Sequence, residues 1–286
     1  MATDTAAASA APKVVRTTKR PSGPFRWVRE RIIPIIGSLV LLYMFLPIFV
    51  VILFSFNTPT GRFNYTWTYN PSLEAWTNLC EPGGMCEALR LSLTIGLLAT
   101  LGSVILGTLV AFAIARHRFR GRSATNLLIF MPMATPEVVM GSSLLTLFVA
   151  MNFARGLPTI LIAHIMFCLS FVVVTVKARI AGLDPRLEQA AMDLYADEKT
   201  TFWKVTFPLV LPGIVGASLL AFSLSFDDFI VTNFNSGSTV TFPMYVWGAA
   251  QRGTPPQINV VGSLMFLVSL AIVLVAQVVQ RRRAKA

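Results

Sequence analysis

Three acidic residues stand inside long apolar runs of this chain: Glu137, Asp227 and Asp228. The other ten of the 13 Asp and Glu residues fall in polar segments. A charged carboxylate at the centre of a membrane helix costs roughly 2.5–3.5 kcal/mol, so such residues usually face a cavity, a partner or a cation. We therefore predict an acidic pathway for a positively charged solute. Helix–helix hydrogen bonding, or a position at the outer membrane interface, is the alternative.

Four aromatic residues are candidates for cation–π contacts with such a solute. They are Phe226, Phe229, Tyr245 and Trp247. Because the face of an aromatic ring attracts cations, we include Phe226 and Trp247 among the candidate pathway residues. Apolar packing or an interfacial aromatic belt is the alternative for each of these rings. Neighbouring residues on a helix point about 100° apart, so the side chains of Asp227 and Asp228 cannot both point toward the axis of one pathway.

Residues that would perform catalysis are missing from the sequence. It contains no Walker A motif, no GxGxxG and no Cys/His cluster with the spacing of metal ligands. His117 lies in an Arg-rich segment, and His164 lies inside an apolar run where we expect packing or hydrogen bonding between helices. We therefore predict a protein that is not an enzyme, with no catalytic residues, no metal site and no bound cofactor.

The apolar runs that surround these acids have the length of membrane spans. The chain of 286 residues is 55% hydrophobic and 13% charged, against about 25% charged for a soluble domain. About 17–25 apolar residues cross a bilayer, and each crossing must be helical because a single strand would leave its backbone unpaired in lipid. Six runs qualify: Ile32–Phe56, Leu91–Ala115, Leu127–Phe153, Leu157–Val176, Pro208–Phe234 and Ile258–Val279. The predicted fold class is an all-α polytopic membrane protein with six transmembrane helices.

Positive charge lies on one side of the predicted spans. Twenty of the 24 Lys and Arg residues fall in the two terminal tails and in the segments 116–126 and 177–207. Cytoplasmic loops carry this excess, so both termini and segment 177–207 are predicted to be cytoplasmic. The first apolar run is too long for a signal peptide and has no cleavage site after it, so we interpret it as an uncleaved anchor.

These features predict the following organisation of the chain: residues 1–24 as a disordered cytoplasmic tail, 25–280 as the transmembrane domain, and 281–286 as a basic tail. Cys80 and Cys86 fall in a predicted outer loop, on the oxidising side of the membrane. A disulfide between them is one interpretation, and two free thiols are the one we favour. Cys168 lies in an apolar run, where we expect packing.

Segment 177–207 is nearly balanced in charge, with five basic and five acidic residues. Apolar residues recur in it at helical spacing: Leu187, Ala190, Ala191 and Leu194. Asp184 is placed to cap a helix that has Pro185 at its first position. We predict two short amphipathic helices that dock a soluble partner, with an ordinary surface loop as the alternative.

The stretch from Gln189 to Pro208 resembles the cytoplasmic signature of ABC-importer permeases. In that signature E-A-A is followed after three residues by G, and nine residues later by I-x-L-P. The matching positions are Gln189, Ala190, Ala191, Tyr195, Val205, Phe207 and Pro208. Gln189 replaces the acid, with Glu188 one residue earlier, so either residue could meet the ATPase. Tyr195 replaces the glycine and tolerates a positive φ poorly, so we expect the bend between the helices to be made differently.

Two further stretches narrow the resemblance. Residues 136–143 are similar to the third-span motif of spermidine/putrescine permeases. Residues 225–230, followed by Thr241, Phe242 and Pro243, are similar to the fifth-span motif of the same family. From about residue 30 to the C-terminus, the chain is similar to the PotC-type subunit.

The resemblance implies a type I ABC importer (MetI-like) permease fold in the bacterial inner membrane and the transport of putrescine or spermidine. The implied partners are a homologous PotB-like permease, two copies of a PotA-like ATPase that bind ATP and Mg, and an external PotD-like binding protein. The ATPase would couple through the helices at 185–204. The coupling residues would be Glu188, Gln189, Ala190, Ala191, Asp193, Tyr195 and Pro208.

Three other functions remain open from the sequence. The solute of an ABC permease could be another organic cation, an amino acid, ferric iron or a sugar phosphate. A secondary transporter would use Asp227 or Glu137 as a proton or sodium site and would show two inverted halves, but no clear internal repeat is present. A scaffold or receptor without transport would leave the three intramembrane acids unexplained.

Overall fold

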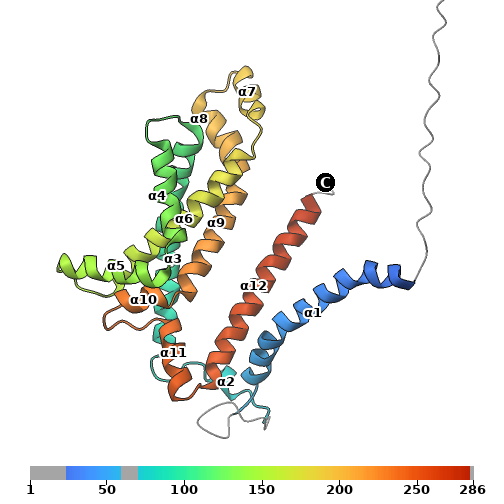
Figure 1. Cartoon of the computed structure of the whole chain (residues 1–286), viewed down its shortest axis with the longest axis vertical. Helices are drawn as coiled ribbons and strands as arrows, with labels where there is room; N and C mark the ends of the chain where they lie inside the picture. Colours follow the sequence, from blue (N-terminus) through green and yellow to red (C-terminus); the bar gives the residue numbers. More distant parts are fainter. Residues whose placement is uncertain (1–23, 59–69, 284–286) are drawn as a thin grey trace, which may run out of the picture. The chain divides into compact units, whose positions relative to one another are not determined.

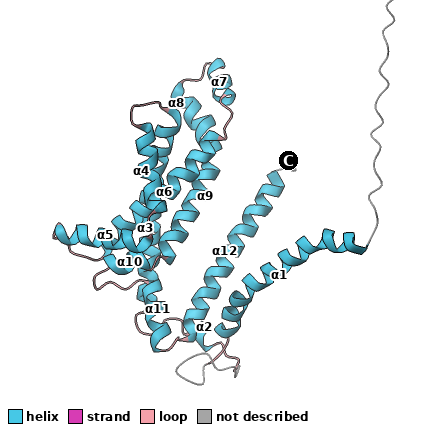
Figure 2. Cartoon of the chain, viewed as in Figure 1, coloured by secondary structure: helices cyan, strands magenta, loops and turns pink. Residues whose placement is uncertain are grey.

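The computed structural model describes residues 24–58 and 70–283, and this part of the chain is nearly all helical (Figures 1 and 2). The helices are α1 (Pro24–Ser55), α2 (Glu74–Thr77), α3 (Met85–Arg116), α4 (Arg122–Ala134), α5 (Glu137–Ala150), α6 (Leu157–Ala181), α7 (Arg186–Asp193), α8 (Glu198–Thr201), the π-helix η1 (Phe202–Thr206), α9 (Phe207–Asp227), α10 (Ile230–Asn235), α11 (Phe242–Arg252) and α12 (Pro256–Arg283). The chain divides into two compact units, Met1–Val50 and Val51–Ala286, which are described separately.

The first unit is formed by α1 up to Val50. The apolar stretch Arg31–Ser55 of this helix is long enough to cross a membrane, and the side chains of residues 31–46 are all exposed. A helix that is apolar on every side is typical of a membrane span. The helix includes Pro24, which the sequence assigned to a disordered tail. The rest of that predicted tail, and residues 284–286 of the predicted basic tail, lie outside the described residues.

The core of the second unit is formed by α3, α6 and α9, which pack against one another (Figure 1). Glycines allow close contact between α3 and α6. A Cβ at Gly102 would lie 2.8 Å from Ile165 Cδ1, and a Cβ at Gly107 would lie 2.7 Å from Val172 Cγ1. Small residues at helix interfaces are favoured in lipid, because packing replaces the hydrophobic effect as the driving force.

Gly107→Val should lower the thermal unfolding midpoint of the purified chain in detergent. The added side chain would overlap Val172, and overpacking of this kind costs about 1–3 kcal/mol. Gly216→Val in α9 is the matched control, because a Cβ there meets nothing within 4 Å while the change in helix propensity is the same. Equal midpoints for the two variants would contradict the close approach of α3 to α6.

The predicted span Leu127–Phe153 is helical, but it is broken in the middle. The chain forms α4 and α5, which meet at an angle of 106°. Between them Thr135 is extended (φ −82°, ψ 130°) and Pro136 precedes the first residue of α5. Proline lacks an N–H and disfavours the helical conformation of the residue before it, so the helix stops there. Among the described residues, five helices are long and apolar enough to span a membrane, or six if this bent pair counts as one span.

The predicted helix Pro208–Phe234 is also interrupted. One helical stretch runs from Glu198 through η1 and α9 and ends at Asp227, and the short α10 follows after a break at residues 228–229. The structure then adds α11, which the sequence did not indicate. The second, fourth and sixth predicted spans correspond to α3, α6 and α12, which extend beyond the predicted bounds.

Segment 177–207 forms two short helices, α7 and α8, as predicted. Asp184 Oδ1 accepts a hydrogen bond of 2.9 Å from the N–H of Arg186, as predicted for a residue that caps this helix, but α7 begins at Arg186, one residue after the predicted start at Pro185. The expectation that Tyr195 avoids a positive φ is wrong, because its φ is 62°. The N–H of Ala196 donates to the Ala191 carbonyl at 3.1 Å, which closes the end of α7 in the way a C-terminal glycine usually does. The Tyr195 side chain is fully exposed, so no packing opposes this conformation.

Cys80 and Cys86 form a disulfide, with their Cα atoms 5.4 Å apart. The favoured interpretation of two free thiols is therefore wrong. Cys168 is a free, buried cysteine, as expected.

Candidate functional site

The break between α9 and α10 places two adjacent carboxylates in different environments. Asp227 is the last residue of α9 and its side chain is exposed, whereas Asp228 is buried. The prediction that the two cannot face one axis is confirmed. The last carbonyl groups of a helix have no intrahelical partner and carry the negative end of the helix dipole. An anionic side chain at this end therefore adds to a negative potential instead of neutralising it.

Asp228 is held by hydrogen bonds to the start of α10. Its Oδ2 accepts from the Thr232 N–H at 2.7 Å and from the Thr232 hydroxyl at 2.8 Å, and its Oδ1 accepts from the Val231 N–H at 3.4 Å. This carboxylate thus satisfies backbone groups that the chain break leaves unpaired. We therefore assign Asp228 a structural role in the site. This is the hydrogen-bonding alternative that the sequence left open.

His164 of α6 contacts Asp228 and the residues around it. Its Nδ1 lies 2.6 Å from Ser225 Oγ, and its Nε2 lies 2.9 Å from Thr232 Oγ1 and 3.4 Å from Asp228 Oδ2. The expectation of a histidine that bonds helices together is confirmed, since these contacts connect α6, α9 and α10. The space among these side chains is about 150 Å³, which is too small for an organic solute.

Glu137 occupies the opposite kind of helix end. It is exposed in the first turn of α5, immediately after the bend that follows α4. The positive end of the helix dipole stabilises a carboxylate there, typically by about 0.3–1 kcal/mol. Glu137 therefore needs a cationic partner less than Asp227 does, although both are exposed acids at breaks in apolar helices.

The two interrupted helices pack against each other through α5 and α10. Asn235 Nδ2 donates to the Gly141 carbonyl at 3.3 Å, and a Cβ at Gly141 would lie 2.8 Å from a ring carbon of Phe234. The sequence did not indicate this pairing, and its one signal is that residues 136–143 and 225–230 are both similar to motifs of a single family. Discontinuous helices that face each other often line transport pathways in membrane proteins.

The candidate aromatic residues differ in exposure. Phe226 is half-buried, with its ring centroid 5.9 Å from that of Phe222 and 6.2 Å from that of Phe242. Trp247 of α11 is 58% exposed and contacts Phe229, with ring centroids 5.3 Å apart. Phe226 thus has the apolar packing considered as the alternative, and Trp247 presents ring surface.

The predicted coupling residues also divide into two groups. Five of them are exposed: Gln189, Ala190, Asp193, Tyr195 and Pro208. Glu188 and Ala191 are half-buried. The Glu188 carboxylate accepts hydrogen bonds from Arg116 and Thr206 of the same chain, which the sequence did not indicate. Of Glu188 and Gln189, the two residues that could meet the ATPase, Gln189 is therefore the exposed one.

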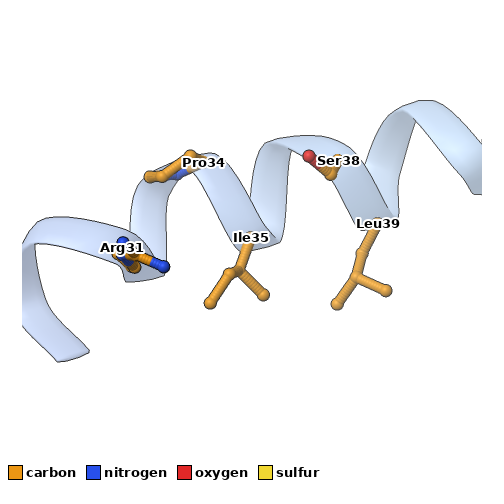
Figure 3. Close-up of a pocket in the computed structure, with 5 residues that line it drawn as sticks. All are labelled: Arg31, Pro34, Ile35, Ser38 and Leu39. Carbon is orange, nitrogen blue, oxygen red and sulfur yellow. The ribbon is translucent and has the colours of Figure 1, made fainter. Parts of the chain in front are cut away.

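A recess on the surface of α1 carries no ligand site. Its lining comes from one helix (Figure 3): Arg31, Pro34, Ile35, Ser38 and Leu39. These side chains follow one another along α1, and no second element of the described chain contributes to the lining. A binding site normally buries most of its ligand between several elements.

Comparison with known proteins gives the family. The model of the binding-protein-dependent transport system inner membrane component matches residues 103–285, which include the coupling segment and the break after α9. This chain belongs to that family. It is therefore an inner-membrane permease and a transport subunit instead of an enzyme, as predicted.

Several relatives of this permease are transport subunits. It is 35% identical over 241 residues to the spermidine/putrescine transport system permease protein PotC of Haemophilus influenzae, covering 84% of this chain and 93% of the relative. PotC of Escherichia coli K12 is 34% identical, with 85% and 91% covered. The putrescine transport system permease protein PotI of Escherichia coli K12 is 36% identical, with 78% and 81% covered.

Solved structures support the fold of the permease. A bacterial ABC transporter that imports the acidic polysaccharide alginate has a chain that aligns with a TM-score of 0.62 at 15% identity, covering 92% of this chain and 99% of that one. The same type of transporter in complex with a pentasaccharide-bound periplasmic protein gives 0.63 at 16% identity, with 91% and 97% covered. The predicted ABC-importer permease fold is confirmed.

Proposed function

We propose that this permease moves a polyamine, putrescine or spermidine, into the cell as part of an ATP-driven importer. The observation that carries the proposal is the exposed carboxylate of Asp227 at the C-terminal end of α9. The charge of Asp227 and the dipole of α9 both favour a cation at this point. A polyamine carries several ammonium groups, and the relatives named PotC and PotI are spermidine/putrescine and putrescine permeases.

The partners proposed for this permease supply the functions that its own sequence lacks. They are a homologous PotB-like permease, two PotA-like ATPases that bind ATP and Mg, and a PotD-like external binding protein. The family is named for its dependence on a binding protein, and one structural relative was solved with a periplasmic protein bound. Exposed apolar side chains on α7 and next to it, such as Leu187, Met192 and Leu194, suit contact with a soluble partner.

The proposed orientation places both termini and α7 in the cytoplasm. The excess of Lys and Arg in the segments that would then be cytoplasmic supports it. In this orientation ATP binding draws the ATPases together and moves α7, and the spans respond as a rigid body. Chemical labelling of a single cysteine introduced at Lys199 from outside intact cells should fail, and successful labelling would contradict the orientation and the ATPase contact together.

Uptake in proteoliposomes tests the proposed function. Liposomes that contain the permease and its co-purified partners should accumulate labelled putrescine or spermidine when ATP and the loaded binding protein are supplied. Accumulation should persist when an uncoupler collapses the ion gradients, because ATP hydrolysis supplies the driving force. Loss of uptake on adding the uncoupler alone would favour an ion-coupled secondary transporter. Uptake of an amino acid or a sugar phosphate instead would keep the ABC mechanism and change the solute.

A further inference from the structure

An ion pair joins the coupling helix α7 to the membrane core of the chain. Arg116, the last residue of α3, donates from Nη1 to Glu188 Oε2 at 2.5 Å and from Nη2 to Glu188 Oε1. The hydroxyl of Thr206, the last residue of η1, donates to Glu188 Oε1 at 2.6 Å. We call these three residues the clasp. They come from three elements, and Thr206 and Arg116 lie 18 and 72 positions from Glu188 along the chain.

The clasp is stronger than an ordinary surface ion pair. Isolated exposed pairs contribute about 0–1 kcal/mol, since water screens them. Here the Glu188 side chain is 19% exposed and that of Arg116 is 35% exposed, and the contact is bidentate, which adds both energy and a defined geometry. Burial by itself raises the pKa of Glu188, but the hydrogen bonds from Arg116 and Thr206 and the charge of Arg116 hold this pKa below its usual range.

Other contacts of α7 are few. No residue of α7 is buried, so apolar packing does little to attach this helix to the rest of the chain. The elements that it contacts most are α8 and η1, which belong to the same segment. Arg116, by contrast, ends a helix that packs along its length against α6 and α9. The clasp therefore connects α7 to α3, a core helix outside its own segment.

The third member of the clasp leads directly to the acidic site. Thr206 closes η1, and η1 continues without a break into α9, whose other end is Asp227. A π-helix holds one extra residue in a turn and is often found at functional sites. The clasp thus joins α7 to α3 through Arg116 and to the helical stretch that contains α9 through Thr206.

We propose that the clasp transmits the motion of the ATPase into the membrane core, with Glu188 as a positioning residue that acts through Arg116 and Thr206 and is not itself an ATPase contact. This inference rests on the proposed ATP-driven import. It names the side-chain contacts that connect the coupling helix α7 to α9, the helix that carries Asp227.

The test compares Arg116→Gln with the control Arg118→Gln in the complete importer. Both substitutions remove one Arg charge at the same end of α3, but Arg118 is exposed and forms no ion pair within the described residues. The measured quantity is the number of ATP molecules hydrolysed per solute imported. Losing a hydrogen bond between charged groups should raise this ratio by about tenfold for Arg116→Gln while the ATPase still co-purifies. The ratio of Arg118→Gln should equal that of the wild type.

A charge exchange separates transmission from simple loss of folding. Glu188→Arg alone should place two cations together and uncouple transport, and combining it with Arg116→Glu should restore most of the wild-type ratio. A wild-type ratio in Arg116→Gln would overturn the inference. Loss of ATPase co-purification in Glu188→Gln would overturn it too, by making Glu188 a direct contact. The wild-type importer serves as its own reference, so absence of ATP-driven uptake in the wild type would instead refute the proposed function.

Discussion

Asp227→Asn is expected to reduce the initial rate of labelled putrescine uptake by about tenfold or more, without loss of folded permease. Asparagine keeps the shape of the side chain and removes its charge. A hydrogen bond to a charged group contributes about 1.5–3 kcal/mol, and each 1.4 kcal/mol corresponds to a factor of ten. Because Asp227 is exposed, its replacement should leave the thermal unfolding midpoint unchanged.

The adjacent Asp228 is the control for this prediction. Asp228→Asn removes an acceptor from the Thr232 N–H and hydroxyl and a neighbour of His164. Its main effect should be a lower unfolding midpoint and a smaller yield of folded permease. If Asp227→Asn leaves uptake unaltered, Asp227 does not belong to the pathway. If it lowers stability as Asp228→Asn does, its role is structural.

Ala190→Trp should abolish co-purification of the ATPase with the permease. Ala190 is exposed on α7, so a bulky ring there projects from the surface that we expect to enter the ATPase. The half-buried Ala191 is less suitable, because a large side chain at that position would also disturb its own chain. The measurement is the ratio of ATPase to permease after affinity purification in detergent.

The matched control for this substitution is Ala181→Trp. Ala181 is exposed at the end of α6, outside α7 and α8, so the added ring should leave the ATPase bound. Full recovery of the ATPase with Ala190→Trp would refute the docking role of α7. Loss of the ATPase with both variants would show that the assay reports a general effect of an added tryptophan.

The positions of the helices followed from the sequence more reliably than their interruptions. Pro136 and the extended residue before it break the third apolar run, yet hydrophobic residues continue on both sides and conceal the bend. No proline occurs at the second break, after Asp227. That break is stabilised by the local hydrogen bonds of Asp228 with Thr232 and by the contact of Asp228 with His164, and the second contact forms only when α6 lies beside α9 and α10.

The conformation of Tyr195 and the pairing of the two cysteines were decided by their surroundings. Tyr195 adopts the left-handed conformation at a cost of roughly 1–2 kcal/mol, because the backbone bonds that end α7 require it. The spacing of Cys80 and Cys86 left their pairing open. Their Cα separation of 5.4 Å, which lies in the range that a disulfide bridges, depends on the turn that precedes α3.

The sequence by itself determined the class of protein, because hydrocarbon excludes charge and unpaired backbone, and long uncharged runs can satisfy both conditions only as helices. It also determined where the acids and the coupling segment lie along the chain. The tertiary structure alone decided which side chains meet: Arg116 with Glu188, 72 residues apart, and His164 with Thr232, 68 residues apart. Such pairs depend on the way helices pack, and helical periodicity along the chain carries no information about the partner on another helix.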